Sequence, residues 1–598
     1  MNSPNPIRLR IPRQDLESSS FFTCKAQAAE QWVTELPKAN VGQTTRLIYQ
    51  AISELNRVRL LPDERLNILE ALRGQLHYVT RALSKHYLNQ PIILPSQARK
   101  VSNLCMTLHQ QLATGYAIVA SHVAALGKRV NGGKPDQLIA KSLCRAINES
   151  TANLINHYQL YEPAAPHLWQ QLHQYYALAF QSNALKHSVN DEEMGNGTVH
   201  QAYIRTLLLG ACKPNQLRQE DFKHLMAPLN YWSEFCQLYY DHDDSLFVVN
   251  TKSDGPPLYR EAYSTAIDES WLGLDTRQLI HHLHELREAQ QGKLIIIDSE
   301  FSISSDLLGH LYLAWGEMSK RTFMRLENND ALNLSIGLSA THHFISGQLS
   351  FEALLEEGGV RTFAVEKTNP FLKAKGGDPR QKDVWDSAYE SNIGKTNVAL
   401  ESIDFHIHKQ EDDAKEDSRY RNHHVMTINA SAHGYCVAWP EDDPVTIKAG
   451  EIVGIQSPHS HNWSVAVIRW VSNDNSQKTQ IGLELISPSA SPYGARIMQR
   501  IGPQSEFLRV LVLPDMPSIN IPVTLITPRV PFKEGQKVTL NQQGKLIQVQ
   551  LTKKLNETGA YNRFEFRKLS IMGSASKTSL PNTEPDSDQS FDSLWKNL

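Results

Sequence analysis

The sequence contains no apolar run long enough to cross a bilayer, although 41% of its 598 residues are hydrophobic. A membrane-spanning helix needs about 20 consecutive apolar residues, and the densest run, residues 294–297, suits a buried strand. Residues 1–13 include charged side chains, but no apolar stretch follows them, so we expect no secretory signal peptide. The sequence therefore predicts a cytoplasmic protein without a membrane span.

The sequence also lacks an excess of charge of either sign. Lys and Arg total 60, Asp and Glu total 63, and the formal net charge is −3. Binding to nucleic-acid phosphates depends on a basic surface. The composition therefore gives no indication of DNA or RNA as a partner.

Cysteine is scarce, and no two cysteines have the spacing of metal ligands. A disulfide framework is not expected in so long a chain. The pattern predicts buried thiols in a reducing cytoplasm. The six residues are Cys24, Cys105, Cys144, Cys212, Cys236 and Cys436.

Sequence motifs of enzymes are absent. There is no Gly-x-Ser-x-Gly, no glycine-rich phosphate loop and no nucleophile with an identifiable base. A catalytic site assembled within residues 241–298 is the remaining enzymatic alternative, and we predict a protein that is not an enzyme. Histidine clusters lack Cys or carboxylate partners at a recognised spacing, so we predict surface histidines and no metal site. The clusters are His281, His282 and His284; His342 and His343; His423 and His424; and His459 and His461.

Hydrophobic spacing predicts helices in the first 240 residues. After an extension over residues 1–26, apolar side chains recur at three- and four-residue steps through residues 27–240. A polar, glycine-containing stretch at residues 187–197 predicts a loop between helical units. We interpret residues 27–240 as a helical interaction domain. The clearest stripe, which follows the helix-start signal at Pro62 and Asp63, consists of Leu69, Leu72, Leu76, Val79 and Leu83.

Strand patterns appear after residue 240. Residues 241–320 form a mixed α/β segment, and strands dominate from Ala331 onward. One interruption, at about residues 341–421, contains a polar, acidic stretch and predicts an insertion within a β-domain. We assign residues 321–500 to a barrel that contains this insertion, and residues 503–570 to a second small β-domain. The predicted fold class is α+β and multidomain, with a helical N-terminal half, the mixed segment, a split antiparallel β-barrel and the second β-domain.

The last 28 residues, 571–598, predict a disordered tail with a short amphipathic end. Four apolar residues there have the i, i+3, i+4, i+7 spacing of one helix face. Such a two-turn helix needs a surface to fold against, so the tail is a candidate docking element, and a frayed terminus is the alternative. The four residues are Phe591, Leu594, Trp595 and Leu598.

A polar turn is predicted at Asn429-Ala-Ser431-Ala-His-Gly434, where a strand ends and apolar alternation resumes afterwards. Such a turn presents side-chain donors and backbone N–H groups at a barrel rim, and glycine allows close approach. A plain hairpin is the alternative interpretation.

The strands that follow this turn make the pattern more specific. Residues 463–471 (WSVAVIRWV) alternate around Arg469, and residues 480–486 read QIGLELI. An Asn-x-Ser-x-x-Gly turn, a Val-x-Arg-Trp strand and a Gly-Leu-Glu-Leu strand in this order resemble a PilZ domain. The resemblance covers at most about a quarter of the chain. It implies a bacterial receptor for cyclic di-GMP with no cofactor other than that ligand.

PilZ domains also carry an Arg-x-x-x-Arg segment before the first barrel strand. Arg321-Thr-Phe-Met-Arg325 has this spacing and precedes the alternating residues 331–340. Nothing immediately upstream of Asn429 matches as well, since Arg419 and Arg421 are only two residues apart. We therefore predict that the barrel is split by the insertion. A solvated basic patch after a helix is the alternative for the two arginines.

The resemblance implies a binding site made by five residues. Guanidinium groups can bind phosphate oxygens or guanine edges in bidentate fashion and can stack on bases. Protein partners are expected on the helical half and on the tail, with output to motility, pili, adhesion or polysaccharide through a domain rearrangement. A scaffold with a degenerate barrel is the alternative. The predicted ligand residues are Arg321, Arg325, Asn429, Ser431 and Gly434.

Overall fold

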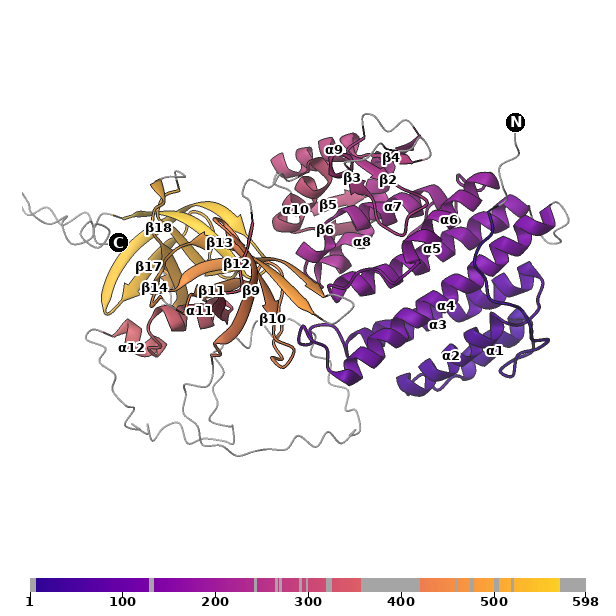
Figure 1. Ribbon diagram of the computed structural model, residues 1–598, viewed down its shortest axis with the longest axis horizontal. Helices are drawn as coiled ribbons and strands as arrows, with labels where there is room; N and C mark the ends of the chain where they lie inside the picture. The colour runs from indigo at the N-terminus through magenta and orange to yellow at the C-terminus, as the bar shows by residue number, and fades with distance from the viewer. Residues whose placement is uncertain are drawn as a thin grey trace, which may run out of the picture.

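A computed structural model describes residues 7–127, 134–240, 245–263, 267, 271–289, 293–296, 299–318, 325–356, 420–458, 460–473, 478–499, 505–517 and 521–569. Helices occupy one side of an elongated molecule, and two β-barrels occupy the other side (Figure 1). The predicted fold class, α+β with several domains, is confirmed.

The N-terminal half is a bundle of helices around one core. In α3 the stripe predicted from Leu69 to Leu83 is buried, and Pro62 with two acidic residues opens the helix, which suits the N-terminal end of its dipole. No helix within the described ranges has the length and apolar character that crossing a membrane requires. The helices are α1 (Ala26–Glu35), α2 (Val41–Leu55), α3 (Pro62–Ser84), α4 (Ser96–Leu126), α5 (Pro135–Gln159), α6 (Leu168–Gln181), α7 (Val199–Ala211) and α8 (Asp221–Trp232).

The mixed segment packs onto this bundle and shares its core. Leu274, Leu279 and Leu311 belong to the same buried cluster as the helix stripes, and Trp315 Nε1 donates to the carbonyl of Leu208 in α7 at 3.0 Å. The segment contains a four-stranded sheet, a hairpin and two helices. Its elements are β1 (Gln237–Tyr239), β2 (Phe247–Val249), β3 (Leu258–Tyr259), β4 (Leu272–Asp275), α9 (Arg277–Glu288), β5 (Lys293–Ile296), β6 (Ser299–Ser302) and α10 (Ser305–Gly316).

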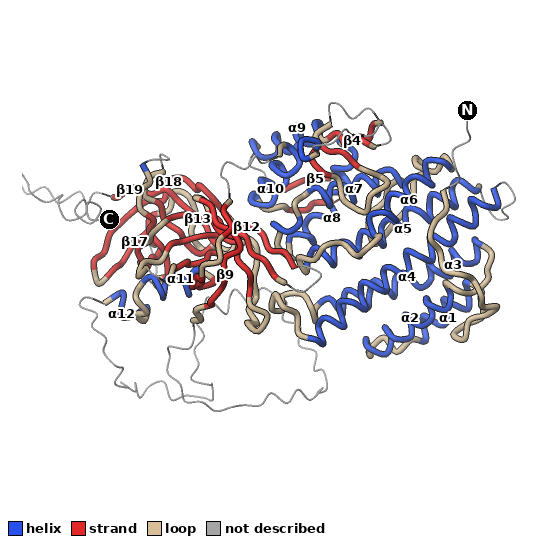
Figure 2. Tube along the Cα trace, viewed as in Figure 1, coloured by secondary structure: helices blue, strands red, loops and turns tan. Residues whose placement is uncertain are grey.

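The next strands form a closed antiparallel barrel. In the order β8, β9, β10, β13, β12, β11, each strand pairs with the next, and β11 pairs back to β8. Figure 2 shows these strands in red beside the helices. The short β7 adds to β9. The strands are β7 (Leu326–Glu327), β8 (Ala331–Ile336), β9 (His423–Ser431), β10 (Gly434–Trp439), β11 (Ile452–Gln456), β12 (Ser464–Asn473) and β13 (Thr479–Ser487).

This first barrel is split along the sequence, as predicted. Leu332 of β8 lies opposite Val425 of β9, although the insertion separates them. The predicted first strand, residues 331–340, was too long, because Gly337 takes a φ of 92° and turns the chain into α11 (Leu338–Ile345). A second short helix, α12 (Phe351–Leu355), follows.

Two histidines predicted to lie on the surface are buried. His342 of α11 is 1% exposed, and its Nε2 lies 3.1 Å from the carbonyl oxygen of Tyr493. Burial lowers the pKa of His342 to about 3. His423 is also buried and pairs with Asp443. The surface interpretation is therefore wrong for both, since the strands and helices that cover them come from distant parts of the chain.

The last described strands close a second barrel in the order β14, β15, β16, β19, β18, β17. Because β14 pairs with β15 and β17, the second barrel begins before residue 503, where the sequence placed its start. Ile452 of the first barrel and Leu511 of the second share one buried cluster. The strands are β14 (Ser491–Ile497), β15 (Leu508–Leu513), β16 (Thr524–Pro528), β17 (Lys537–Gln542), β18 (Lys545–Glu557) and β19 (Tyr561–Lys568).

The first barrel attaches to the helical half at the end opposite the β9–β10 turn. The loops after β10 and at the end of β12 make these contacts, and both lie at the far end of their strands from that turn. Ile92 and Tyr161 of the helical half belong to the barrel core cluster. Three hydrogen bonds of 2.8 Å join Ile92 N to Val445 O, Asn473 N to Tyr161 O, and Arg218 Nε to Ala449 O.

Candidate ligand site at the rim of the first barrel

The turn between β9 and β10 places three of the predicted residues together. Ser431 lies opposite Gly434, and the Ser431 hydroxyl donates to the Gly434 carbonyl at 3.3 Å. A Cβ on Gly434 would lie 1.9 Å from the carbonyl oxygen of Leu483, so only glycine fits there. Asn429 pairs with Cys436 across the hairpin. Its Oδ1 is buried and has no hydrogen-bond partner in the part of the chain that the structure describes.

The arginine segment reaches this turn through β7. Leu326 lies opposite Ala430 on β9, which places the preceding Arg325 next to Ser431. Arg325 is exposed, and it lies close enough to Cys436 to counteract in part the rise in the thiol pKa that burial causes. Arg321 lies outside the described residues. The structure therefore brings Arg325 to the same rim as the three turn residues.

Arg421, one of the competing arginines, lies at the other end of β9 from the turn. Arg421 is exposed and precedes the start of β9, whereas Ser431 ends that strand. Nine residues of strand separate the two ends by about 26 Å. Arg419 lies outside the described residues. A contiguous arrangement that uses Arg421 at this rim is therefore excluded by the strand direction.

The other two motif strands are β12 and β13. β13 pairs with β10 next to the turn, and β12 pairs with β13. Glu484 lies opposite Gly434 and forms a bidentate ion pair with Arg469, with Nη2 3.1 Å from Oε1. A Cβ on Gly482 would lie 2.0 Å from Trp470 Nε1. The Val-x-Arg-Trp and Gly-Leu-Glu-Leu motifs thus pair with each other, and they support the rim instead of lining it.

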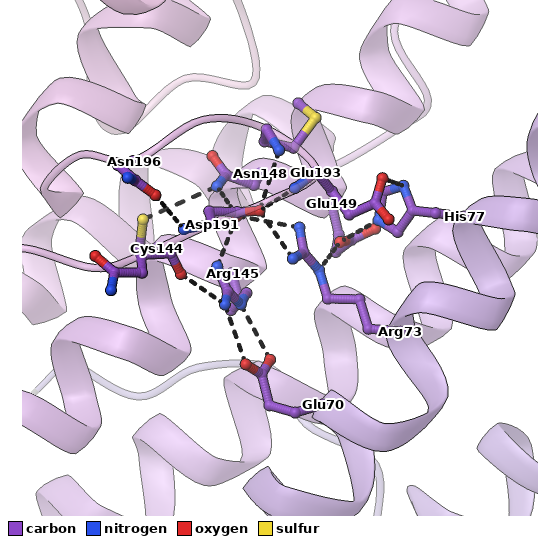
Figure 3. A network of polar contacts seen from close by, with 12 residues as sticks. Glu70, Arg73, His77, Cys144, Arg145, Asn148, Glu149, Asp191, Glu193 and Asn196 are labelled. Atoms are coloured by element: carbon purple, nitrogen blue, oxygen red, sulfur yellow. Dashed lines mark hydrogen bonds and ion pairs between the residues drawn. The ribbon is translucent and has the colours of Figure 1, made fainter. Parts of the chain in front are cut away.

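A second polar cluster lies inside the helical half and was missed by the sequence analysis (Figure 3). Glu149 of α5 is fully buried. Its carboxylate lies 2.7 Å from Arg73 Nε, 2.9 Å from His77 Nε2 and 2.8 Å from His109 Nδ1. Burial alone would raise the pKa of Glu149, but these neighbours hold it well below its usual value. No sequence signal could reveal the cluster, since only Arg73 and His77 are close in the sequence, and His109 and Glu149 come from two other helices.

The cluster continues to the loop that the sequence placed at residues 187–197. Asp191 accepts two hydrogen bonds from Arg73 and one from Asn148, at 2.7–3.1 Å. Its Oδ1 also accepts from the backbone N–H groups of Glu193 and Met194. The loop is therefore fixed to α3 and α5 by buried charge.

By donor type and spacing, His77, His109 and Glu149 could hold a metal ion, since their ligand atoms lie within 4.8 Å of one another. However, Arg73 already binds the same carboxylate at 2.7 Å. A divalent cation would have to displace this guanidinium or lie beside it without solvent. We interpret the cluster as structural: its buried hydrogen bonds and ion pairs hold α3, α4 and α5 together.

Comparison with known proteins agrees with this domain order. Three family models match the chain in succession: the N-terminal domain of the cyclic-di-GMP receptor FimW over residues 27–243, its middle PilZ domain over residues 246–492, and its C-terminal β-barrel domain over residues 493–569. A protein of Pseudomonas aeruginosa named cyclic-di-GMP receptor FimW is 34% identical over 627 aligned positions, which cover 100% of each chain. No solved structure matches the chain. The order of the three domains and the full-length similarity show that this protein belongs to the FimW family of cyclic-di-GMP receptors.

Proposed function

We propose that this protein is a receptor for cyclic di-GMP and not an enzyme, and that it binds its ligand at the β9–β10 rim. The observation that carries the proposal is the β7–β9 pairing, which brings Arg325 beside the polar turn across the insertion. The proposed ligand residues are Arg321, Arg325, Asn429, Ser431 and Gly434.

The chemistry of these residues suits a ligand with two phosphates and two guanines. Arg321 and Arg325 can divide phosphate binding and base stacking between them. The unpartnered Oδ1 of Asn429 is an acceptor, and the Watson–Crick edge of guanine offers N–H donors. Gly434 allows the turn to form, because any side chain there would collide with the carbonyl oxygen of Leu483.

Titration calorimetry of the full-length protein with cyclic di-GMP, GTP and cyclic GMP tests the proposal. We expect saturable heat with cyclic di-GMP and at least tenfold weaker binding of both mononucleotides, since each carries one guanine instead of two. Absence of heat and of a thermal shift at saturating cyclic di-GMP would instead support the scaffold alternative.

Ser431→Ala is expected to weaken cyclic di-GMP binding by about 0.5–1.5 kcal/mol, the net contribution of one hydrogen bond. The change removes a hydroxyl with little change of shape, so the unfolding temperature should stay within about 2 °C. Calorimetry together with a thermal melt measures both. An unchanged affinity would remove Ser431 from the site.

We further propose that the receptor acts in the bacterial cytoplasm and relays ligand binding to motility, pilus, adhesion or polysaccharide output. The six cysteines are free, which supports a reducing compartment. Protein partners would dock on the helical half, where Tyr49, Tyr78 and Phe180 are exposed. The relay that we propose is a domain rearrangement, and the hydrogen bonds between the first barrel and the helical half support a route for it.

A further inference from the structure

The second barrel is strongly basic, unlike the chain as a whole. Residues 493–569 contain 12 Lys and Arg and 5 Asp and Glu, whereas the formal net charge of the whole protein is −3. A local excess of this kind is the usual mark of a surface that binds an anionic partner.

Part of this charge lies on one outer face of the barrel. Lys537 of β17, Gln550 of β18 and Arg567 of β19 are directly opposite one another across the three strands. Val549 and Leu551, on either side of Gln550, are fully buried, so the row points away from the barrel interior. Lys537 and Arg567 are exposed.

The hairpin between β17 and β18 lies at the end of this face, where Leu546 alternates to the same side as Gln550 and Lys545 lies at the tip of the hairpin. Lys545 is exposed, and the adjacent Leu546 is 57% exposed. Among the described residues, Lys537 and Lys545 form no ion pair. We call the set Lys537, Lys545, Leu546, Gln550 and Arg567 the basic face. It combines unpaired positive charge with an exposed apolar side chain, which suits an acidic, amphipathic peptide.

The C-terminal segment of this chain has that composition. Residues 584–592 contain Glu584, Asp586, Asp588 and Asp592 and no basic residue. Phe591 in this stretch and Trp595 just after it supply large apolar side chains.

The C-terminal segment also leaves the second barrel close to the basic face. The Leu569 N–H donates to the carbonyl of Gln548 on β18 at 2.9 Å, so the chain leaves the barrel beside the basic face. The chain between Leu569 and Glu584 spans up to about 50 Å when extended. This length exceeds the length of β18, so residues 584–598 can reach the basic face.

We propose that residues 584–598 bind the basic face of the same molecule. The acidic residues contact Lys537, Lys545 and Arg567, and the aromatic residues pack against Leu546. The second barrel then has a binding function that is separate from the rim of the first barrel, and the tail competes there with any other acidic partner.

Fluorine NMR of the full-length protein, labelled with 5-fluorotryptophan, tests the proposal through Trp595. Trp595→Phe assigns the resonance, and a synthetic peptide of residues 580–598 supplies the free chemical shift. We expect the Trp595 resonance of the intact protein to differ from that of the peptide. It should move to the peptide position in the double variant Lys537→Glu, Lys545→Glu and in about 0.5 M NaCl, where charge attraction is screened.

Lys38→Glu in the helical half is the matched control, since Lys38 is also exposed; it should leave the Trp595 resonance unchanged. If the intact protein already shows the peptide shift, or if the double variant keeps the bound shift, the proposal is overturned. A bound shift that disappears on dilution would assign the tail to a second copy and would also overturn it.

A carbodiimide cross-linker, which joins amines to carboxylates in contact, provides a second readout that needs no variant. Cross-links from Lys537 or Lys545 to Asp586 or Asp588 within one chain support the proposal. Tail cross-links confined to lysines of the helical half contradict it.

Discussion

Arg325→Ala is expected to weaken cyclic di-GMP binding by about 1.5–3 kcal/mol, or roughly 10- to 150-fold, the range for a hydrogen bond to a charged group. Arg321→Ala should have an effect of the same size. Arg325 lies beside Ser431 because β7 pairs with β9, and its guanidinium is exposed there. Calorimetric titration of each variant measures the change in dissociation constant.

Arg421→Ala is the matched control for this prediction. Arg421 is also an exposed arginine, but it precedes the other end of β9, a strand about 26 Å long that ends at Ser431. Its loss should change the affinity by less than twofold. If Arg421→Ala weakens binding more than Arg325→Ala does, the ligand does not bind at the β9–β10 rim.

Glu149→Ala is expected to lower the free energy of unfolding of the helical half by about 3–5 kcal/mol, the cost of breaking a buried ion pair from one side. The substitution removes the acceptor of Arg73 Nε and of two buried histidines, and it leaves Asp191 as the carboxylate that pairs with Arg73. Urea denaturation followed by circular dichroism measures the loss.

Glu193→Ala is the control for this second prediction, because Glu193 pairs with Arg81 at the surface of the same network. An exposed pair contributes about 0–1 kcal/mol, so the loss should be small. Folding lowers the pKa of Glu149 well below its usual value of 4.5. Its contribution is therefore complete above about pH 4.5 and is lost as the pH falls through the folded value. A Glu149→Ala protein as stable as Glu193→Ala would show that the buried charge is dispensable.

The sequence predicted features that depend on neighbouring residues. The stripe in α3 was visible because helix periodicity is local. The turn at Asn429 to Gly434 was visible because its strands alternate on either side. The split of the first barrel was also predictable, since an Arg-x-x-x-Arg segment and an alternating strand stood together before the insertion.

The second barrel shows what local sequence patterns cannot predict, namely which strands pair with each other. A small β-domain was predicted over residues 503–570, but the pairing of β14 with β15 and β17 was not. Alternation identifies a strand and its buried face, and it does not identify the neighbours of that strand. The buried histidines His342 and His423 were misjudged for the same reason.

The sequence by itself determined the class of the protein, the helical and β-rich halves, and the residue types at the proposed ligand rim. Only the tertiary structure decided that Arg325, and not Arg421, lies beside Ser431. It also assembled Arg73, His77, His109 and Glu149 in one buried cluster. Local periodicity follows from backbone geometry over a few residues, whereas these contacts depend on how strands and helices distant in the sequence pack together.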